Sequence, residues 1–369
     1  MMTVTPEAQR LRDFYAMKPN ARIVQEEFGF YSLERWKREG YVTDDTDLSA
    51  LFGFDASAKC GLGQLGWCEA AFDPGFTEEI LEDRGEHELV RDWAGRHVLY
   101  FKNRRNGFMP EYVDHPVKDW ETWERDVKWR IDPATASRYA DLDARMADAK
   151  AKAAKGFVMS QGLVGGYMYL RSLVGPEGIL YMVYDEPELV HDMMQTWLAL
   201  ADAVIAKHQA HVALDELFLA EDICYKGGAL ISPDMMRAFL FPYYQELIKN
   251  VKRRQKDDRH MFLHIDTDGD CRKVIPLYGE LGMDVMSPFE GASDCDVVAI
   301  RQQHPELRMR GGFDKRIMAE GKEAIDREIE RIMPFMTARG GYMPTCDHGV
   351  PEEVSFENYM YYREKMKAF

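Results

Sequence analysis

The sequence has no stretch of 18 consecutive apolar residues and no CxxC pair. The first absence argues against a transmembrane helix, and the N-terminus MMTVTPEAQRLRDFY also lacks the apolar core of a signal peptide. The six cysteines are scattered, and a chain of 369 residues is long enough to bury a core without disulfide staples. We therefore expect a cytoplasmic protein that does not associate with a membrane.

Positive charge is also scarce. There are 63 acidic against 47 basic residues, which gives a formal net charge of -16, and no basic stripe offsets it. Phosphate backbones are held by surplus Lys and Arg, so a nucleic-acid partner is not expected. Hydrophobic residues make up 46% of the chain, as expected of a folded globular protein.

From about residue 156 onward, short apolar runs alternate with longer amphipathic stretches, the pattern of repeated βα units. The predicted strands are residues 157–161, 216–220, 261–265, 284–288, 307–311 and 342–345. The predicted helices are residues 187–210, 234–254, 271–282, 296–304, 322–339 and 355–367.

The front of the chain is less regular. We place two more strands at residues 71–76 and 98–101 and a solvated surface helix at residues 144–155. No GxGxxG turn follows an early strand, which favours a closed barrel over a doubly wound sheet. The predicted fold is α/β: a single (β/α)8 TIM barrel over residues 1–369, with an irregular N-terminal part (1–150, with inserted loops) and regular βα repeats over 156–369.

Ionisable groups follow five consecutive predicted strands, and in such a barrel these positions converge on one mouth. They are Glu221 and Asp222; Asp266, Asp268 and Asp270; Glu290; Asp314, Lys315 and Arg316; and Cys346, Asp347 and His348. Gathered carboxylates repel one another, so a divalent metal or a cationic part of a substrate would relieve them. The alternative is that the carboxylates cap helices and pair with nearby Lys and Arg.

Two further residues leave alternatives open. Cys346 lies two residues from His348, so it could be a nucleophile, a metal ligand or a small buried side chain. His264 alternates with Asp266 on one predicted strand and points to the same face, where it could serve as a ligand or a core histidine.

Several motifs in order resemble the uroporphyrinogen decarboxylase-like barrel proteins. They are ED-x-x-YKGGALISPDMMRAFLFPYY from Glu221, DTDGD, GMDVMSPFEG, RGGFDKR and GGYMPTCDHGVPEEVSFENY, with a looser match at EEFGFYSLERWKREG. True uroporphyrinogen decarboxylases carry an arginine-bearing MRQAGRYLP segment near the N-terminus. This chain has Glu26 and Glu27 there, so porphyrinogen decarboxylation is not expected.

The corrinoid-linked methyltransferases are the closer branch, and their thiol-activating members bind zinc through an HxCG motif and a late Cys. When the glycine is aligned with Gly269, this chain has Asp266 and Asp268 at the His and Cys positions, and His348 lies near the late ligand. The resemblance therefore implies Zn²⁺ held by residues drawn from Glu221, Asp266, Asp268, Cys346 and His348. Cobalamin would come on a separate corrinoid protein, since no DxHxxG-type motif is present.

Carboxylates in place of sulfur suit the polarisation of oxygen better than that of a thiol. We therefore expect a methyltransferase that passes a methyl group from a methylated small molecule, a methoxylated one in the first instance, to a corrinoid protein. Asp268, His348 and Lys315 would be catalytic, and the substrate-binding residues would be Asp222, Tyr225, Glu290, Asp314 and Tyr342.

Two other functions stay open. One is a metal-independent decarboxylase or lyase that acts on a small carboxylated molecule, with Asp268 or His348 as the proton donor. The other is a barrel that only binds a ligand or partner, although so many repelling carboxylates weigh against an inert binder. The sequence also leaves a homodimer open.

Overall fold

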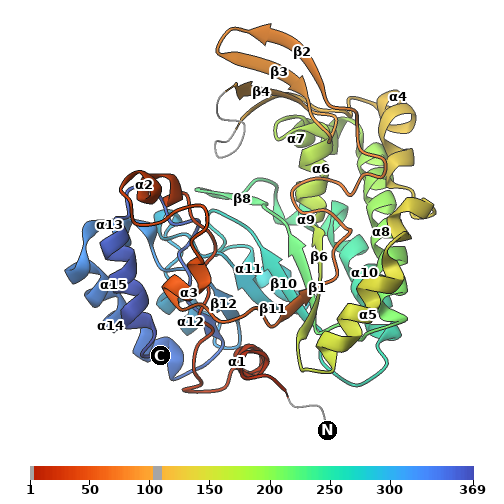
Figure 1. Ribbon diagram of the computed structural model, residues 1–369. Helices are drawn as coiled ribbons and strands as arrows, with labels where there is room; N and C mark the ends of the chain where they lie inside the picture. The colour runs from red at the N-terminus through yellow and green to blue at the C-terminus, as the bar shows by residue number, and fades with distance from the viewer. Residues whose placement is uncertain (1–3, 103–109) are drawn as a thin grey trace.

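A curled parallel sheet forms the centre of the protein (Figure 1). The computed structural model describes residues 4–102 and 110–369. Its central sheet has the order β1-β6-β7-β10-β11-β12-β13, and every neighbouring pair is parallel. The strands are β1 Lys59–Gly61, β6 Val158–Val164, β7 Glu216–Ala220, β10 Phe262–Asp266, β11 Met283–Ser287, β12 Arg308–Arg310 and β13 Tyr342–Met343.

All six strands predicted after residue 156 are confirmed, but neither of the two segments predicted at the front joins the central sheet. Residues 71–76 form no strand, since Pro and Gly lie among them. Residues 98–101 belong to β4, in a separate antiparallel sheet, and the seventh parallel strand is the short β1. In the same antiparallel sheet, residues 87–91 alternate between buried and half-buried, which suits a sheet with one solvated face.

The expected closed barrel of eight strands is not found in the described part of the chain. The seam between β13 and β1 is covered instead by an extended segment before helix α2. The Asp55 amide donates to the Gln25 carbonyl at 2.7 Å on one side, and Phe30 forms a bridge with Val350 on the other. Seven strands with this seam make a curled, open form of the predicted α/β fold.

Helices follow most of the parallel strands. Their bounds are α1 Pro6–Tyr15, α2 Leu33–Arg38, α3 Leu48–Phe52, α4 Trp120–Thr122, α5 Leu142–Ala153, α6 Gly166–Val174, α7 Gly178–Asp185, α8 Pro187–Gln209, α9 Pro233–Phe239, α10 Phe241–Arg254, α11 Ile275–Gly279, α12 Val297–Gln303, α13 Lys315–Glu320, α14 Lys322–Thr337 and α15 Phe356–Met366. The helix predicted at 234–254 is two helices, because Pro242 lacks an N–H and begins a new helix at α10. The predicted surface helix is confirmed as α5, most of whose residues are exposed or half-buried.

Alternation along the strands separates two cores. Leu217 and Leu219 of β7 belong to the large apolar cluster between the sheet and its helices, whereas Glu216 meets Tyr15 and His264 on the inner side. Helix α1 lies below the sheet in Figure 1 and packs Phe14 and Tyr15 against the first residues of strands β6 and β10. This helix covers the amino ends of the strands, so the carboxyl ends face the opposite side.

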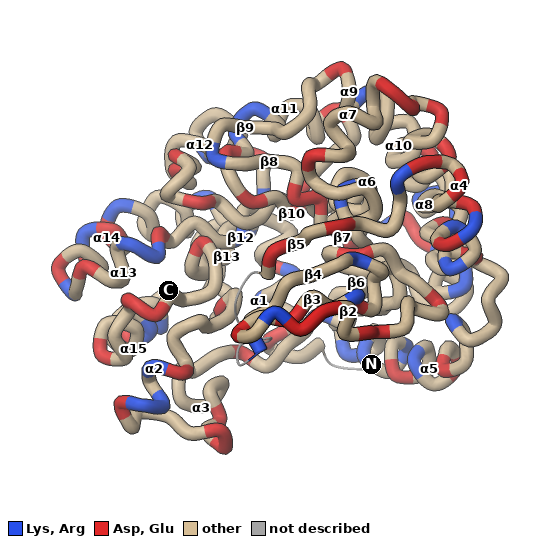
Figure 2. Tube along the Cα trace, turned by 90° about the horizontal axis from the view of Figure 1, so that it is seen from above, with Lys and Arg blue, Asp and Glu red and all other residues tan. Residues whose placement is uncertain are grey.

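Two small antiparallel sheets lie outside the central sheet. Strands β2 Glu79–Arg84, β3 His87–Arg91, β4 His97–Phe101 and β5 Glu111–Asp114 form a sheet at the top of Figure 1, and β8 Cys224–Tyr225 pairs with β9 Gly228–Ala229. Acidic and basic residues are interspersed around the outer helices (Figure 2). None of the helices in the described ranges is long and apolar enough to span a bilayer.

Candidate active site

Three sequence-predicted residues meet where the parallel strands end. Asp268 follows β10, Glu290 follows β11 and His348 follows β13. The Nδ1 atom of His348 lies 3.8 Å from Asp268 Oδ1 and 3.8 Å from Glu290 Oε1. One ligand atom from each of the three residues lies within 4.8 Å of the others, which is close enough for a shared ion. We call Asp268, Glu290 and His348 the mouth triad.

The backbone around Gly269 holds the triad in place. Its amide donates to Glu290 Oε2 at 2.9 Å, which ties the loop after β10 to the loop after β11. Gly269 has φ +76°, and a Cβ there would lie 2.7 Å from the backbone of Tyr225. Only glycine meets both conditions, so this loop has little room to move. The ring of His348 is fixed by stacking on Phe28, with centroids 5.2 Å apart.

One lysine lies beside the triad. Lys315 Nζ is 3.8 Å from Glu290 Oε1 and 3.9 Å from Asp347 Oδ1. Asp347 is fully buried and accepts hydrogen bonds from the amides of Gly291 and Lys315. Lys315 therefore supplies one positive charge to a site with several carboxylates.

The mouth carboxylates are short of positive charge. Burial raises the pKa of Asp268 to about 6; His348 lowers this pKa, while Asp222 and Glu290 raise it further. Burial also raises the pKa of Asp266 to about 7, even though Ser287 donates a hydrogen bond to its Oδ2 atom. A bound cation would let both groups ionise fully.

The carboxylate of Glu216 lies one layer deeper, and both of its oxygens have partners. Glu216 accepts from Tyr15, Ser160 and His264, and it lies 2.5 Å from Lys59 Nζ. Burial alone would raise the pKa of Glu216, but Lys59 and His264 outweigh it and hold the pKa well below the ordinary value. The His264 ring also contacts Ser287 Oγ at 2.8 Å and so joins this layer to Asp266 above it.

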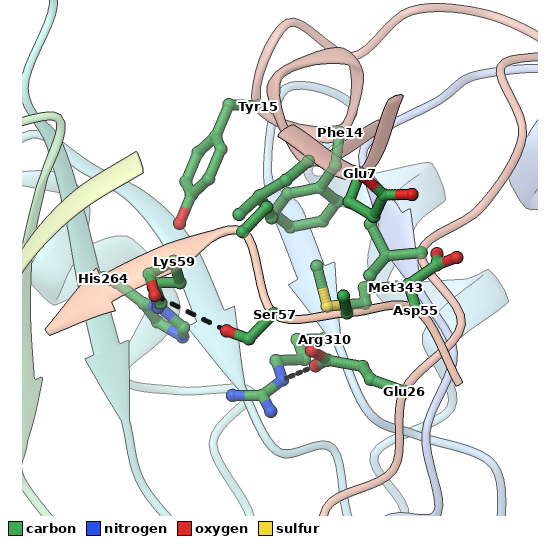
Figure 3. A pocket seen from close by; sticks show the side chains of 14 residues that line it. Glu7, Phe14, Tyr15, Glu26, Asp55, Ser57, Lys59, His264, Arg310 and Met343 are labelled. Carbon is green, nitrogen blue, oxygen red and sulfur yellow. Dashed lines mark hydrogen bonds and ion pairs between the residues drawn. The ribbon is translucent and has the colours of Figure 1, made fainter. Parts of the chain in front are cut away.

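A cavity of about 240 Å³ opens at the seam of the sheet (Figure 3). Helix α1 lines one side, and Lys59, His264, Arg310 and Met343 line the inner wall. Arg310 Nε lies 2.7 Å from Glu26 Oε1, and the two terminal nitrogens point away from that carboxylate in Figure 3. The cavity is thus of mixed polarity and lies apart from the triad, none of whose residues lines it.

Several predicted residues are not brought to the triad. Glu221 is buried, accepts from the Tyr244 hydroxyl at 2.5 Å, and has a pKa raised to about 7 by burial. Tyr342 belongs to the apolar cluster outside the sheet and donates to the Gly311 carbonyl. Cys346 is buried and its thiol pKa is raised by burial. Asp314 caps α13 and pairs with Arg316.

Two predicted residues border the mouth without joining the triad. The Asp222 carboxylate lies 2.5 Å from the Arg171 guanidinium. Asp222 also has an unusual φ of +42°. Tyr225 lies on the β8–β9 hairpin, is 54% exposed, and accepts the Asp270 amide on its carbonyl. Both border the Gly269 loop and are available to a substrate.

Sequence reasoning missed Phe28, Ser287 and Lys59. Ser287 and Lys59 lie at strand ends, where strand alternation points them to the same inner face as His264, so that signal was present. Nothing in the sequence could have placed Phe28 over His348, because the two residues are 320 positions apart.

The sequence matches a known protein family. The family model described as Uroporphyrinogen decarboxylase (URO-D) matches residues 145–369, more than half of the sequence. The protein belongs to the uroporphyrinogen decarboxylase family. No curated protein matched the sequence.

Solved structures support the same fold. A methyltransferase from Methanosarcina mazei is 14% identical with a TM-score of 0.55, over 97% of this chain and 98% of the other. Xylanase B from Clostridium stercorarium F9 is 11% identical with a TM-score of 0.33, over 62% of this chain and 78% of the other. At these identities the first match shows a shared fold alone, and the second is too distant to carry an argument.

Proposed function

We propose that this member of the family is a metal-dependent methyltransferase. It would take a methyl group from a methylated small molecule, in the first instance a methoxylated one, and pass it to a corrinoid protein. The mouth triad carries this proposal, because it gathers two carboxylates and an imidazole where the parallel strands end. The Methanosarcina methyltransferase has the same fold, so the proposed reaction is compatible with the fold.

The triad fits a divalent metal such as Zn²⁺. Oxygen and imidazole nitrogen are suitable zinc ligands, and three protein ligands leave a fourth position for a reacting group. The raised pKa of Asp268, caused first by burial, is what a site short of one cation would show. When bound, the metal would polarise the ether oxygen and stabilise the alkoxide or phenolate that leaves.

The chain's own residues would orient the donor around that position. Lys315 lies next to Glu290 and can attract the negative charge that develops on the leaving oxygen. Arg171 fixes Asp222, and the exposed ring of Tyr225 offers an apolar surface for the donor. The methyl acceptor would be cobalamin on a partner protein that approaches the mouth.

The test is methyl transfer in vitro. Purified protein with one equivalent of zinc would be mixed with reduced cobalamin and a panel of methoxylated aromatic acids and alcohols, and methylcobalamin would be followed by its absorbance. We expect turnover with at least one donor, and a loss of turnover in Glu290→Gln and His348→Ala.

Asp294→Asn is the matched control, because Asp294 lies in the same loop with a side chain that is 84% exposed. This variant should retain the activity of the wild type. Equal activity in Glu290→Gln and Asp294→Asn would contradict the proposed site.

The second candidate is a metal-independent decarboxylase or lyase. The observation that favours it is Asp266, whose pKa, raised to about 7 by burial, leaves a proton available near neutral pH. Release of CO₂ from a carboxylated substrate by protein stripped with a chelator, without cobalamin, would favour this reading.

A further inference from the structure

Two buried cysteines touch directly behind the mouth triad. The Sγ atoms of Cys271 and Cys295 are 3.6 Å apart, and the two residues are 0% and 1% exposed. Cys271 lies three residues after Asp268, and Cys295 lies five residues after Glu290. The loops that end in these thiols are therefore the loops that carry the two carboxylates of the triad.

A short chain of hydrogen bonds links the thiols to the triad. The Cys295 thiol donates to the Gly269 carbonyl at 3.4 Å, and the Gly269 amide donates to Glu290 Oε2 at 2.9 Å. Gly269 also packs so closely on Tyr225 that a Cβ would not fit. A shift of either sulfur atom would therefore be passed to Glu290 and to Asp268, which precedes Gly269.

We propose that Cys271 and Cys295 form a reversible disulfide and that its formation loosens the mouth triad. The effect on metal binding rests on the proposed function, whereas the disulfide itself does not. Bond formation requires the sulfur atoms to approach from 3.6 Å to about 2.05 Å. It also removes the thiol proton that Cys295 donates to Gly269.

The oxidant in this proposal is hydrogen peroxide, a small uncharged molecule. One thiolate attacks the peroxide, so an S–O bond forms, the O–O bond breaks and one water leaves after protonation. The second sulfur then attacks the sulfur of the sulfenic acid; the S–S bond forms, the S–O bond breaks, and the leaving hydroxide takes the proton of the second thiol and departs as a second water. In sum, two thiols and one hydrogen peroxide give one disulfide and two waters.

The environment favours Cys295 as the first to react. The hydrogen bond from Cys271 lowers the pKa of the Cys295 thiol, despite its burial. Desolvation of the thiol, aided by Glu69, instead raises the pKa of Cys68 to about 12, so this cysteine is less reactive although it lies at the surface. All six cysteines are free in the structure, so the pair is in its reduced form.

The first test is peptide mapping after mild treatment of the folded protein with hydrogen peroxide and alkylation of the remaining thiols. We expect one cross-linked pair of peptides that contain Cys271 and Cys295, and its loss after dithiothreitol. Cys271→Ser should give no such pair, and Cys68→Ser should give it as the wild type does. Alkylation of both Cys271 and Cys295 after peroxide treatment of the wild type would overturn the proposal.

The second test measures the coupling. Hydrogen exchange in peptides that cover residues 266–272 and 288–296 should become faster in the oxidised protein, with or without metal. Zinc should bind about tenfold more weakly, the size of effect expected when a contact that supports metal ligands is lost. Peroxide should leave zinc binding by Cys271→Ser unchanged.

The outcomes separate the two proposals. A disulfide with unchanged exchange in both peptides would overturn the coupling. A reduced protein that binds no zinc would count against the proposed function alone, since mapping and exchange would still decide the redox proposal.

Discussion

Glu216 and Asp266 are carboxylates of neighbouring strands on the inner side of the sheet, yet their surroundings differ. Glu216 has Lys59, His264, Tyr15 and Ser160 around it, and its pKa is held well below the ordinary value. Asp266 accepts a hydrogen bond from Ser287, and burial raises its pKa to about 7.

Two layers of the same curled sheet therefore differ in how their carboxylates are balanced. The deeper layer is balanced by the chain's own donors, so its charges need nothing from outside. The mouth layer, with Asp266 and the triad, holds more carboxylates than cations. Buried charges of one sign are rarely kept without a partner, so the mouth is where a ligand is expected.

The largest effect is expected when the deep layer loses its negative charge. Glu216→Gln would leave Lys59 without its counterion. We expect a loss of about 3–5 kcal/mol in the free energy of unfolding, the usual result of removing one partner of a buried pair. Urea unfolding at pH 7 measures it; a change below about 1 kcal/mol would mean that the pair is not important for stability.

In the metal-free protein, the raised pKa of Asp266 should make the free energy of unfolding depend on pH. Its carboxyl pKa is about 7 when folded and 3.8 in the ordinary case, so the folded state prefers the protonated form. The stability that this proton provides is complete below pH 4 and is lost as the pH rises to 7.

Asp266→Asn cannot ionise and should therefore gain stability relative to the wild type over that range, by at most about 4 kcal/mol. Urea midpoints at four pH values from 4 to 7 measure the difference. A constant difference between the two proteins would contradict the raised pKa.

Zinc should stabilise the wild type and not His348→Ala. At a hundred times its Kd, a ligand that binds only the folded state adds about 2.7 kcal/mol. Thermal unfolding with and without zinc tests this, and Asp294→Asn should respond as the wild type does. If zinc stabilised His348→Ala as much as the wild type, His348 would not be a zinc ligand.

The smallest expected effect concerns Phe28, which stacks on His348. Phe28→Leu should retain the fold and weaken zinc binding by a few fold, because stacked rings contribute about 0.5–1.5 kcal/mol. Calorimetric titration measures the affinity, and a change as large as that of His348→Ala would point to a wider structural role.

The regular half of the fold could be predicted from the sequence because its strands are short apolar runs between amphipathic helices. The front could not, since β1 has only three residues and β4 pairs with neighbours in a different sheet. Apolar runs predict strands but do not say which sheet a strand joins. This is why the predicted strand at residues 98–101 was placed in the barrel.

The site shows the same division. Strand ends brought Asp268, Glu290 and His348 together as expected, because the carboxyl ends of parallel strands meet at one edge. Glu221 also follows a strand, but it accepts a hydrogen bond from Tyr244 instead of joining the triad, and Tyr342 begins β13 and faces the outer core. Position along a strand fixes the neighbourhood of a side chain, whereas its partners depend on tertiary packing.

The most direct test of the account is the zinc content of the purified protein after reconstitution and dialysis, measured by elemental analysis for the wild type, Glu290→Gln and Asp294→Asn. We predict one zinc per chain in the wild type and in Asp294→Asn, and a large loss in Glu290→Gln. The absence of bound metal from all three, or equal zinc in all three, would contradict a metal site at the mouth triad.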